Sequence, residues 1–193
     1  MTLRTGMTNL VAQLRVMTDA DTAEFVIGSE TYWSNDHLQD ELDRNRQAVY
    51  REPIYPTVIY DTSNAPQYFD YYWNLPDVEE ATSGTAIWSL QNANGSAIGT
   101  ADYTVEYTAQ HLRFNVSTDG STYFLTYRAY DLNRAAEMIW RKKAANVAGR
   151  FDIATDNHKL SRSQLRQSYL DMAKHFHQQG GSRSKQFIRP DVR

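Results

Sequence analysis

The chain has 193 residues, of which 41% are apolar and 22% are charged, and its formal net charge is −3. This size predicts one domain, or one domain that carries an insertion. The absence of cysteine excludes disulfides, thiolate chemistry and cysteine-based zinc sites. No apolar run approaches the roughly 20 residues that cross a bilayer, and residues 1–17 lack the features of a signal peptide. We therefore expect no membrane association.

The charge is distributed unevenly along the chain. Residues 1–133 hold 7 Lys/Arg and 18 Asp/Glu, a net charge of −11, whereas residues 134–193 hold 13 Lys/Arg and 5 Asp/Glu, a net charge of +8. Three interpretations are open. The two ends form separately solvated faces, the acidic face of one subunit packs against the basic face of an identical neighbour, or the basic surface lies near nucleic acid.

Residues 1–53 are predicted to form a helical half. A first helix is expected from Thr8 to Met17, and two short strands are expected on either side of Gly28. Ser34 is a good N-cap for a second helix, which Pro53 is expected to stop. The apolar face of this second helix would carry Leu38, Leu42, Asn45 and Val49.

Residues 54–130 alternate aromatic and β-branched side chains, a pattern that predicts a small antiparallel sandwich or barrel. The expected strands cover residues 57–60, 68–73, 86–90, 103–107, 112–116 and 123–127. Turn signals occur at Ser83-Gly84, Asn94-Gly95 and Asp119-Gly120. The last of these lies between two alternating runs, so it is the strongest prediction of a hairpin.

Two more helices are expected in residues 131–179. Asp131 is a plausible N-cap for a helix over residues 132–151, a loop follows to residue 160, and Ser161 to Gln164 match a capping box for a helix that reaches about Gln178. Residues 180–193 are expected to be a flexible tail. The predicted fold class is therefore α+β. A small helical bundle, with two N-terminal and two C-terminal helices, carries an inserted antiparallel β-sandwich or barrel module and a flexible C-terminal tail.

The sequence shows none of the motifs that mark common catalytic sites. Phosphate-binding loops, dinucleotide-binding glycine patterns, nucleophile elbows and H-E-x-x-H are all missing. His175 and His177 are two residues apart on a predicted helix and point in different directions. The acidic clusters at residues 40–43 and 77–80 are interpreted as solvated surfaces. We therefore expect a protein that is not an enzyme, with no catalytic residue, metal or cofactor.

Two surfaces are candidates for contacts. In the aromatic run of residues 68–73 a strand would be aromatic on both sides, which favours core plus a subunit interface over stacking on a sugar or base. The candidate interface residues of this β module are Tyr68, Tyr72 and Trp73. A candidate inter-subunit or channel surface is basic and comprises Arg141, Lys142, Lys143, Arg162 and Arg166. No base-reading motif accompanies it, so sequence-specific DNA binding is not expected.

The helical flanks carry a family resemblance. Residues 9–15 and 31–43, together with residues 130–133, 135–145, 151–156 and 160–164, resemble the head-tail connector (adaptor) proteins of tailed phages. The resemblance implies a twelve-fold ring of identical subunits beneath the portal protein at the capsid vertex. Such a ring extends the DNA channel, which genomic DNA passes non-specifically, and provides the docking platform for the tail or for a stopper or neck protein.

The same resemblance implies a location and a portal contact. The protein would assemble in the host cytoplasm and reside in the virion neck. The tail would reach the portal through Arg183, Lys185, Phe187, Ile188 and Arg189. The alternatives are another neck or tail-completion protein of the virion, a carbohydrate-binding module built on the β insertion, and an enzyme.

Overall fold

The computed structural model describes residues 3–21, 26–27, 30–31, 33–81, 87–148, 153–155, 158–160 and 162–180. These residues form a mixed α+β structure with four α-helices and a curled, antiparallel six-stranded sheet that makes a half-barrel. The chain divides into two compact units, unit 1 from Met1 to Ala135 and unit 2 from Ala136 to Arg193. Unit 1 holds 8 Lys/Arg and 18 Asp/Glu, a net charge of −10, and unit 2 holds 12 and 5, a net charge of +7.

Unit 1 begins with a short 3₁₀ turn, η1 (Thr5–Met7), followed by helix α1 (Thr8–Thr18). This confirms the first predicted helix, whose apolar face is buried through Leu10, Val11 and Leu14. Strands β1 (Val26–Ile27) and β2 (Glu30–Thr31) form an antiparallel pair, and helix α2 (Asn35–Arg44) follows. The Oγ of Ser34 accepts a hydrogen bond from the backbone N–H of His37 at 3.3 Å, which confirms the predicted N-cap.

The predicted end of the second helix is wrong. α2 stops at Arg44, and strand β3 (Arg46–Tyr60) begins two residues later and runs through Pro53. The helical spacing that extended the prediction to Val49 is coincidental, because Val49 is buried in the core of the sheet. A register shift between Val49 and Glu52 interrupts the alternation of the strand, so the period-2 pattern does not stand out in the sequence.

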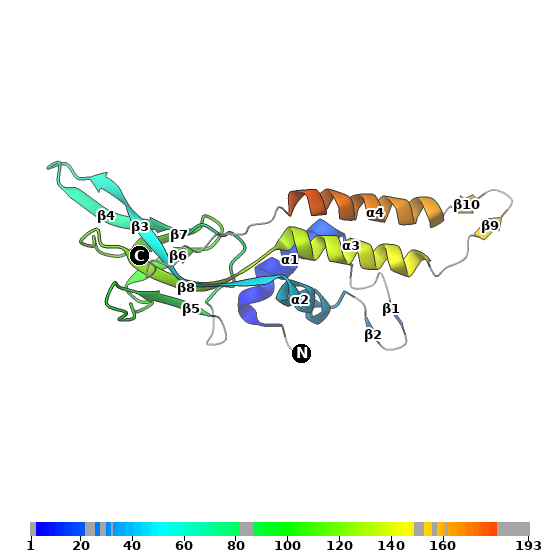
Figure 1. Cartoon of the computed structure of the whole chain (residues 1–193), viewed down its shortest axis with the longest axis horizontal. Helices are drawn as coiled ribbons and strands as arrows, with labels where there is room; N and C mark the ends of the chain where they lie inside the picture. Colours follow the sequence, from blue (N-terminus) through cyan, green and yellow to red (C-terminus); the bar gives the residue numbers. More distant parts are fainter. Residues whose placement is uncertain are drawn as a thin grey trace, which may run out of the picture. The chain divides into compact units, whose positions relative to one another are not determined.

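The other strands of the large sheet are β4 (Pro66–Tyr72), β5 (Trp88–Gln91), β6 (Tyr103–Glu106), β7 (His111–Phe114) and β8 (Tyr123–Tyr130). Their order is β5-β8-β3-β4-β7-β6, and every pairing is antiparallel (Figure 1). The predicted strand positions are thus confirmed, except that β3 begins at residue 46 and not at residue 57. The core on the inner face of the curl is rich in aromatic rings, including Tyr71, Trp73, Tyr103, Phe114 and Tyr127.

The hairpin predicted at Asp119-Gly120 does not exist. β7 lies between β4 and β6, whereas β8 lies between β5 and β3, so the loop between β7 and β8 joins strands that are not neighbours. This loop packs along β4 instead, where the N–H of Thr118 donates to the carbonyl of Tyr68 at 3.0 Å. The turn at Asn94-Gly95 is confirmed by a hydrogen bond from Gly95 N–H to Asn92 O at 3.0 Å. Ser83-Gly84 lies outside the described residues.

Helix α3 (Leu132–Ala148) begins in unit 1 and continues into unit 2. The Oδ1 of Asp131 accepts from the N–H of Arg134 at 2.9 Å, which confirms the predicted N-cap. Strands β9 (Ile153–Thr155) and β10 (His158–Leu160) pair where a loop was expected, and helix α4 (Arg162–Gln179) ends close to the predicted position. Ser161 of the predicted capping box is not among the described residues.

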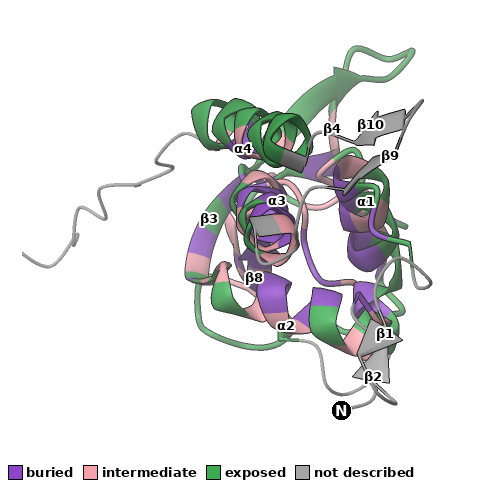
Figure 2. Cartoon of the chain, turned by 90° about the vertical axis from the view of Figure 1, so that its right-hand side faces the viewer, coloured by how far each residue is buried: buried purple, intermediate pink, exposed green. Residues whose placement is uncertain are grey.

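Within unit 2, α3 and α4 contact each other through side chains. The rings of Trp140 and Tyr169 lie 5.3 Å apart, and Nδ1 of His177 lies 3.0 Å from Oε2 of Glu137. Most described residues of α4 are exposed (Figure 2). Among the apolar residues of α4, Phe176 is buried, whereas Leu165 and Met172 are exposed. Most of α4 is therefore available to solvent or to other molecules.

Candidate functional site

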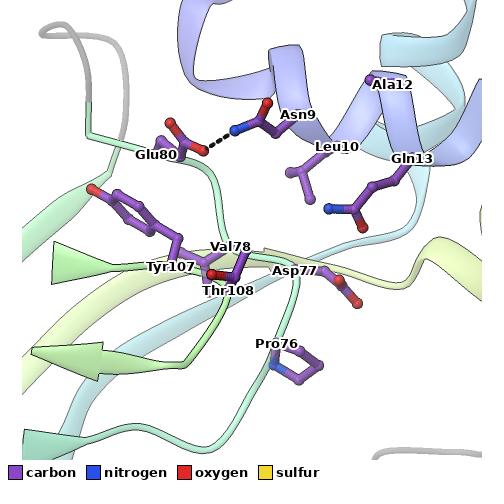
Figure 3. Close-up of a pocket in the computed structure, with 10 residues that line it drawn as sticks. All are labelled: Asn9, Leu10, Ala12, Gln13, Pro76, Asp77, Val78, Glu80, Tyr107 and Thr108. Carbon is purple, nitrogen blue, oxygen red and sulfur yellow. Dashed lines mark hydrogen bonds between the residues drawn. The ribbon is translucent and has the colours of Figure 1, made fainter.

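A cleft of about 350 Å³ lies in unit 1 between α1 and the segment that follows β4 (Figure 3). Helix α1 contributes Asn9, Leu10, Ala12 and Gln13, and the remaining lining residues are Pro76, Asp77, Val78, Glu80, Tyr107 and Thr108. The amide of Asn9 donates to Oε1 of Glu80 at 2.5 Å across one side of the cleft. The lining is thus mixed, with apolar side chains beside polar ones, and both of its charged side chains, Asp77 and Glu80, are acidic. Among the described residues, no group of three or more potential metal ligands is assembled here or elsewhere.

A buried ionic network beside the cleft fixes its walls. The guanidinium of Arg4 forms two hydrogen bonds with the carboxylate of Asp43, at 2.8 and 2.7 Å, and a third from Nε to Oε1 of Glu79 at 2.8 Å. Glu79 is 1% exposed and also accepts from the hydroxyl of Tyr130 at 2.8 Å and from Arg128 at 3.1 Å. The network therefore joins the N-terminal turn, α2, the segment after β4, and β8.

Two pKa values reflect this network. The hydrogen bond with Asp43 is the largest cause that raises the pKa of Arg4, with Glu79 adding to it. Burial raises the pKa of Tyr130, and its hydrogen bond to the carboxylate of Glu79 raises it further. The interpretation of residues 77–80 as a solvated acidic cluster is therefore wrong for Glu79, because this carboxylate is a buried acceptor that organises unit 1.

The outer face of the sheet carries a second polar cluster. Nε2 of His111 lies 2.8 Å from Oδ1 of Asp70, and Arg113 donates to the same oxygen at 3.3 Å. The ring of His111 stacks on Tyr72 with centroids 4.9 Å apart, and Tyr55 of β3 stands opposite Tyr72 in the register. The result is an aromatic surface on β3, β4 and β7 that is held in place by one buried carboxylate.

The structure separates the three candidate interface residues of the β module. Tyr72 is 51% exposed and lies on this outer face. Trp73 is only 3% exposed and packs in the core against Trp88, with ring centroids 5.5 Å apart. Tyr68 is half-buried, because the loop at Gly120 covers its ring. Trp73 is thus a core residue and does not reach the surface.

A third feature is an extension of the sheet that sequence reasoning missed. Strand β3 continues past the end of β8 from residue 55 on, and β4 lies outside β7 up to residue 69. Val58 to Tyr60 therefore pair with β4 as a two-stranded ribbon that extends from the sheet (Figure 1). We call residues 55–69 the β3–β4 arm. Its exposed large side chains are Tyr55, Val58, Ile59 and Tyr60. The sequence did contain a signal for a longer exposed strand, because residues 53–60 carry no charge. The predicted strand began only at residue 57, so the prediction did not show how long the arm is.

The predicted basic surface is only partly a surface. Lys143 is 4% exposed and its ammonium lies 4.8 Å above the ring of Trp140. Arg141 is half-exposed and donates to the buried carboxylate of Glu137 at 2.8 Å. Lys142 is half-buried, Arg166 is exposed on α4, and the side chain of Arg162 is outside the described part of the structure. Lys143 is therefore buried and does not belong to the candidate basic surface.

The predicted portal-contacting residues of the tail, Arg183, Lys185, Phe187, Ile188 and Arg189, all lie outside the described residues. None of the described helices is both long enough and apolar enough to cross a membrane. No family model, no curated protein and no solved structure matches this chain.

Proposed function

We propose that the chain is a structural head-tail adaptor of a tailed phage, which forms a twelve-fold ring beneath the portal protein. The observation that carries this proposal is the opposite charge of the two compact units, −10 for unit 1 and +7 for unit 2. A ring needs heterologous contacts, in which one patch of a subunit meets a different patch of its neighbour. Opposite net charges on two parts of one chain favour this head-to-tail contact and set its register.

The family resemblance supports the same proposal. The resembling segments at the two flanks of the chain fall largely on helices α1, α2, α3 and α4. In the proposed adaptor these four helices close into one bundle. The curled sheet is the inserted β module, and its fine architecture as a sandwich or barrel belongs to the proposal as well. The ring extends the DNA channel and provides the platform on which the tail or neck docks.

The C-terminal tail is proposed to attach the ring to the portal. Residues 181–193 contain four basic residues and one acid, so they suit an acidic surface of a partner. The apolar pair Phe187-Ile188 would anchor the contact, and Arg183, Lys185 and Arg189 would pair with portal carboxylates. Such segments gain order on binding and thereby cover a large surface.

The decisive experiment is electron microscopy of phage particles that carry this chain. We expect about twelve copies in direct contact with the portal, since adaptors of this kind form closed rings. A ring that sits lower, without touching the portal, assigns the chain to a neck or tail-completion role. Absence of the chain from purified particles contradicts both assignments.

A second experiment isolates the tail. Purified chain that ends at residue 181 is mixed with portal rings and compared with the full-length chain by co-sedimentation. We expect the truncated chain to lose portal binding and to keep its far-UV circular dichroism. The matched control is the substitution Val116→Ser on an exposed loop residue, which should leave binding unchanged. Equal binding by the truncated and full-length chains contradicts the role of the tail.

A further inference from the structure

The pairing of the long strand β3 changes partway along its length. From Arg46 to Ile54 it pairs with β8, and from Tyr55 to Tyr60 it pairs with β4. Among the strands that the structure describes, none pairs with the other edge of residues 55–60. Folded proteins usually protect such an edge with charges, prolines or a covering segment, because an open edge is a template for pairing with another chain.

The arm carries only part of that protection. Pro56 lacks a backbone N–H and so weakens pairing at one position. A second register shift, between Thr57 and Val58, changes the direction in which the following side chains point. Beyond these two features, residues 57–60 carry no Lys, Arg, Asp or Glu on the edge. The arm can therefore bind another molecule mainly through its side chains. Backbone pairing with that molecule is limited to residues 57–60.

Four large side chains of the arm are exposed to solvent. Tyr55 and Tyr60 are 65% and 62% exposed, and Val58 and Ile59 are 45% and 43% exposed. Val58 and Tyr60 point to one face of the ribbon and Ile59 to the other, because consecutive side chains of a strand alternate between its faces. Large exposed side chains that are gathered on one short element are typical of an interaction surface. Tyrosine is also among the residues that contribute most to binding energy at protein interfaces.

The arm is almost free of charge in a highly charged chain. The sequence holds 43 charged residues among 193, yet residues 53–69 contain a single one, Asp61. Asp61 lies in the turn, where its Oδ1 accepts from the N–H groups of Ser63 and Ala65, both at 2.9 Å. The carboxylate thus holds the turn between β3 and β4 in place through hydrogen bonds to the backbone of that turn. The rest of the arm can leave water at a contact without burying an unpaired charge.

We propose that the β3–β4 arm is the apolar docking element between identical subunits, and that its occupant is a second copy of this chain. The inference rests on the proposed ring. Charge complementarity selects the occupant: unit 1 with −10 and unit 2 with +7 attract each other between copies, so another copy is the partner that the chain itself encodes. The neutral arm supplies an apolar contact from which water is excluded. Charged surfaces alone do not supply such a contact.

The test replaces arm side chains and measures self-association. Val58→Lys with Ile59→Lys places two charges on the arm, and Tyr55→Ser with Tyr60→Ser removes its aromatic rings. The matched controls are Val16→Lys and Val116→Lys, which place a charge on valines that are 84% and 75% exposed elsewhere in unit 1. Sedimentation velocity and mass photometry of the full chain follow the oligomers, alone and with portal rings. Circular dichroism and thermal unfolding show that each variant is folded.

We expect both arm variants to weaken self-association at least tenfold, while both controls associate as the unaltered chain does. A photo-reactive side chain at position 60 should give a cross-link whose two peptides both come from this chain. Arm variants that associate like the controls overturn the proposal. So does a full-length chain that stays monomeric both alone and with portal rings, or a cross-link that joins position 60 only to another protein.

These outcomes are distinct from failure of the adaptor proposal. If particles contain the ring beneath the portal and the arm variants still form it, the adaptor proposal stands and the arm proposal fails. If the chain is absent from particles but the arm variants lose self-association, the adaptor proposal fails and the arm proposal stands.

Discussion

The guanidinium of Arg4 donates from Nε to a carboxylate oxygen of Glu79 at 2.8 Å, although 75 positions separate the two residues in the chain. This contact, together with the two hydrogen bonds from Arg4 to Asp43, attaches the N-terminal turn to α2 and to the segment after β4. The N-terminal turn is therefore an integral part of unit 1.

Removing Glu79 should destabilise the protein strongly. The substitution Glu79→Ala leaves Arg4 and Arg128 without their shared acceptor in a buried setting, and breaking a buried ion pair from one side costs about 3–5 kcal/mol. Urea unfolding measures this loss. The control is Gln167→Ala, because its hydrogen bond to Asp171, at 2.9 Å on the exposed surface of α4, should contribute less than about 1 kcal/mol. Equal losses in the two variants contradict the role of the network.

Gly6 should not tolerate a side chain. A Cβ added at this position would stand 2.1 Å from the carbonyl oxygen of Glu80, whose N–H donates to the carbonyl of Gly6 at 3.1 Å. We expect Gly6→Ala to lower the free energy of unfolding by about 1–3 kcal/mol through overpacking. Gly99→Ala is the matched control, since its Cβ would meet only the flexible carboxylate of Asp102 at 3.2 Å. Thermal unfolding of both variants compares them, and a Gly6→Ala protein as stable as the control contradicts the prediction.

Two glycines with left-handed backbones allow a cleaner comparison. Gly95 and Gly120 have φ values of +83° and +79°, so alanine costs about 1–2 kcal/mol of backbone strain at either position. At Gly120 the added Cβ would also lie 3.0 Å from the ring of Tyr68, whereas at Gly95 the nearest atom is a nitrogen of Arg51 at 3.7 Å. Denaturant unfolding should therefore show a larger loss for Gly120→Ala. The opposite order would mean that the loop at residue 120 does not pack on β4.

Alkaline pH should unfold the protein through its buried tyrosines. Burial is the largest cause that raises the pKa of six of the 13 tyrosines, namely Tyr71, Tyr103, Tyr107, Tyr123, Tyr127 and Tyr130. A raised pKa means that the folded state holds the proton more tightly than the unfolded state. The stability that these groups contribute is present below the ordinary tyrosine pKa of about 10 and decreases as the pH rises above it.

A titration from about pH 9 to about pH 12 checks this prediction, since the ordinary tyrosine pKa lies inside the range. Absorbance of the phenolate follows ionisation, and circular dichroism follows the fold in the same samples. We expect these six tyrosines, of which Tyr107 and Tyr123 are partly buried and the others fully buried, to ionise only together with loss of the circular dichroism signal. Complete ionisation of all 13 tyrosines in a folded protein would contradict the packing of the core.

The positions of the strands were predictable because they depend on neighbouring residues. Alternation of apolar and polar side chains is a local property, and it located all six strands of the large sheet except the first half of β3. The caps at Ser34 and Asp131 were predictable for the same reason, since each side chain bonds a backbone N–H only three residues away. The uneven charge of the chain is likewise readable from residue types alone.

The pairing of these strands was decided by contacts between distant residues. A turn signal at Asp119-Gly120 is compatible both with a hairpin and with a loop that packs along β4, and only the core that places β8 beside β3 selects the second. The end of α2 follows from the same cause, because pairing of residues 46–49 with β8 outweighs the high helix propensity of Arg46, Gln47 and Ala48.

The positions of the local elements, their caps and the division of charge along the chain can all be read from the residues in order, because backbone preference and side-chain periodicity act over a few residues. Tertiary structure alone decided which strands meet, which acids are buried, and which part of β3 stays open as an arm. Glu79 and Glu80 are adjacent and chemically identical, yet one is buried between two arginines and the other lines a cleft. Their difference arises from partners brought in from elsewhere in the chain, such as Arg4 and Arg128.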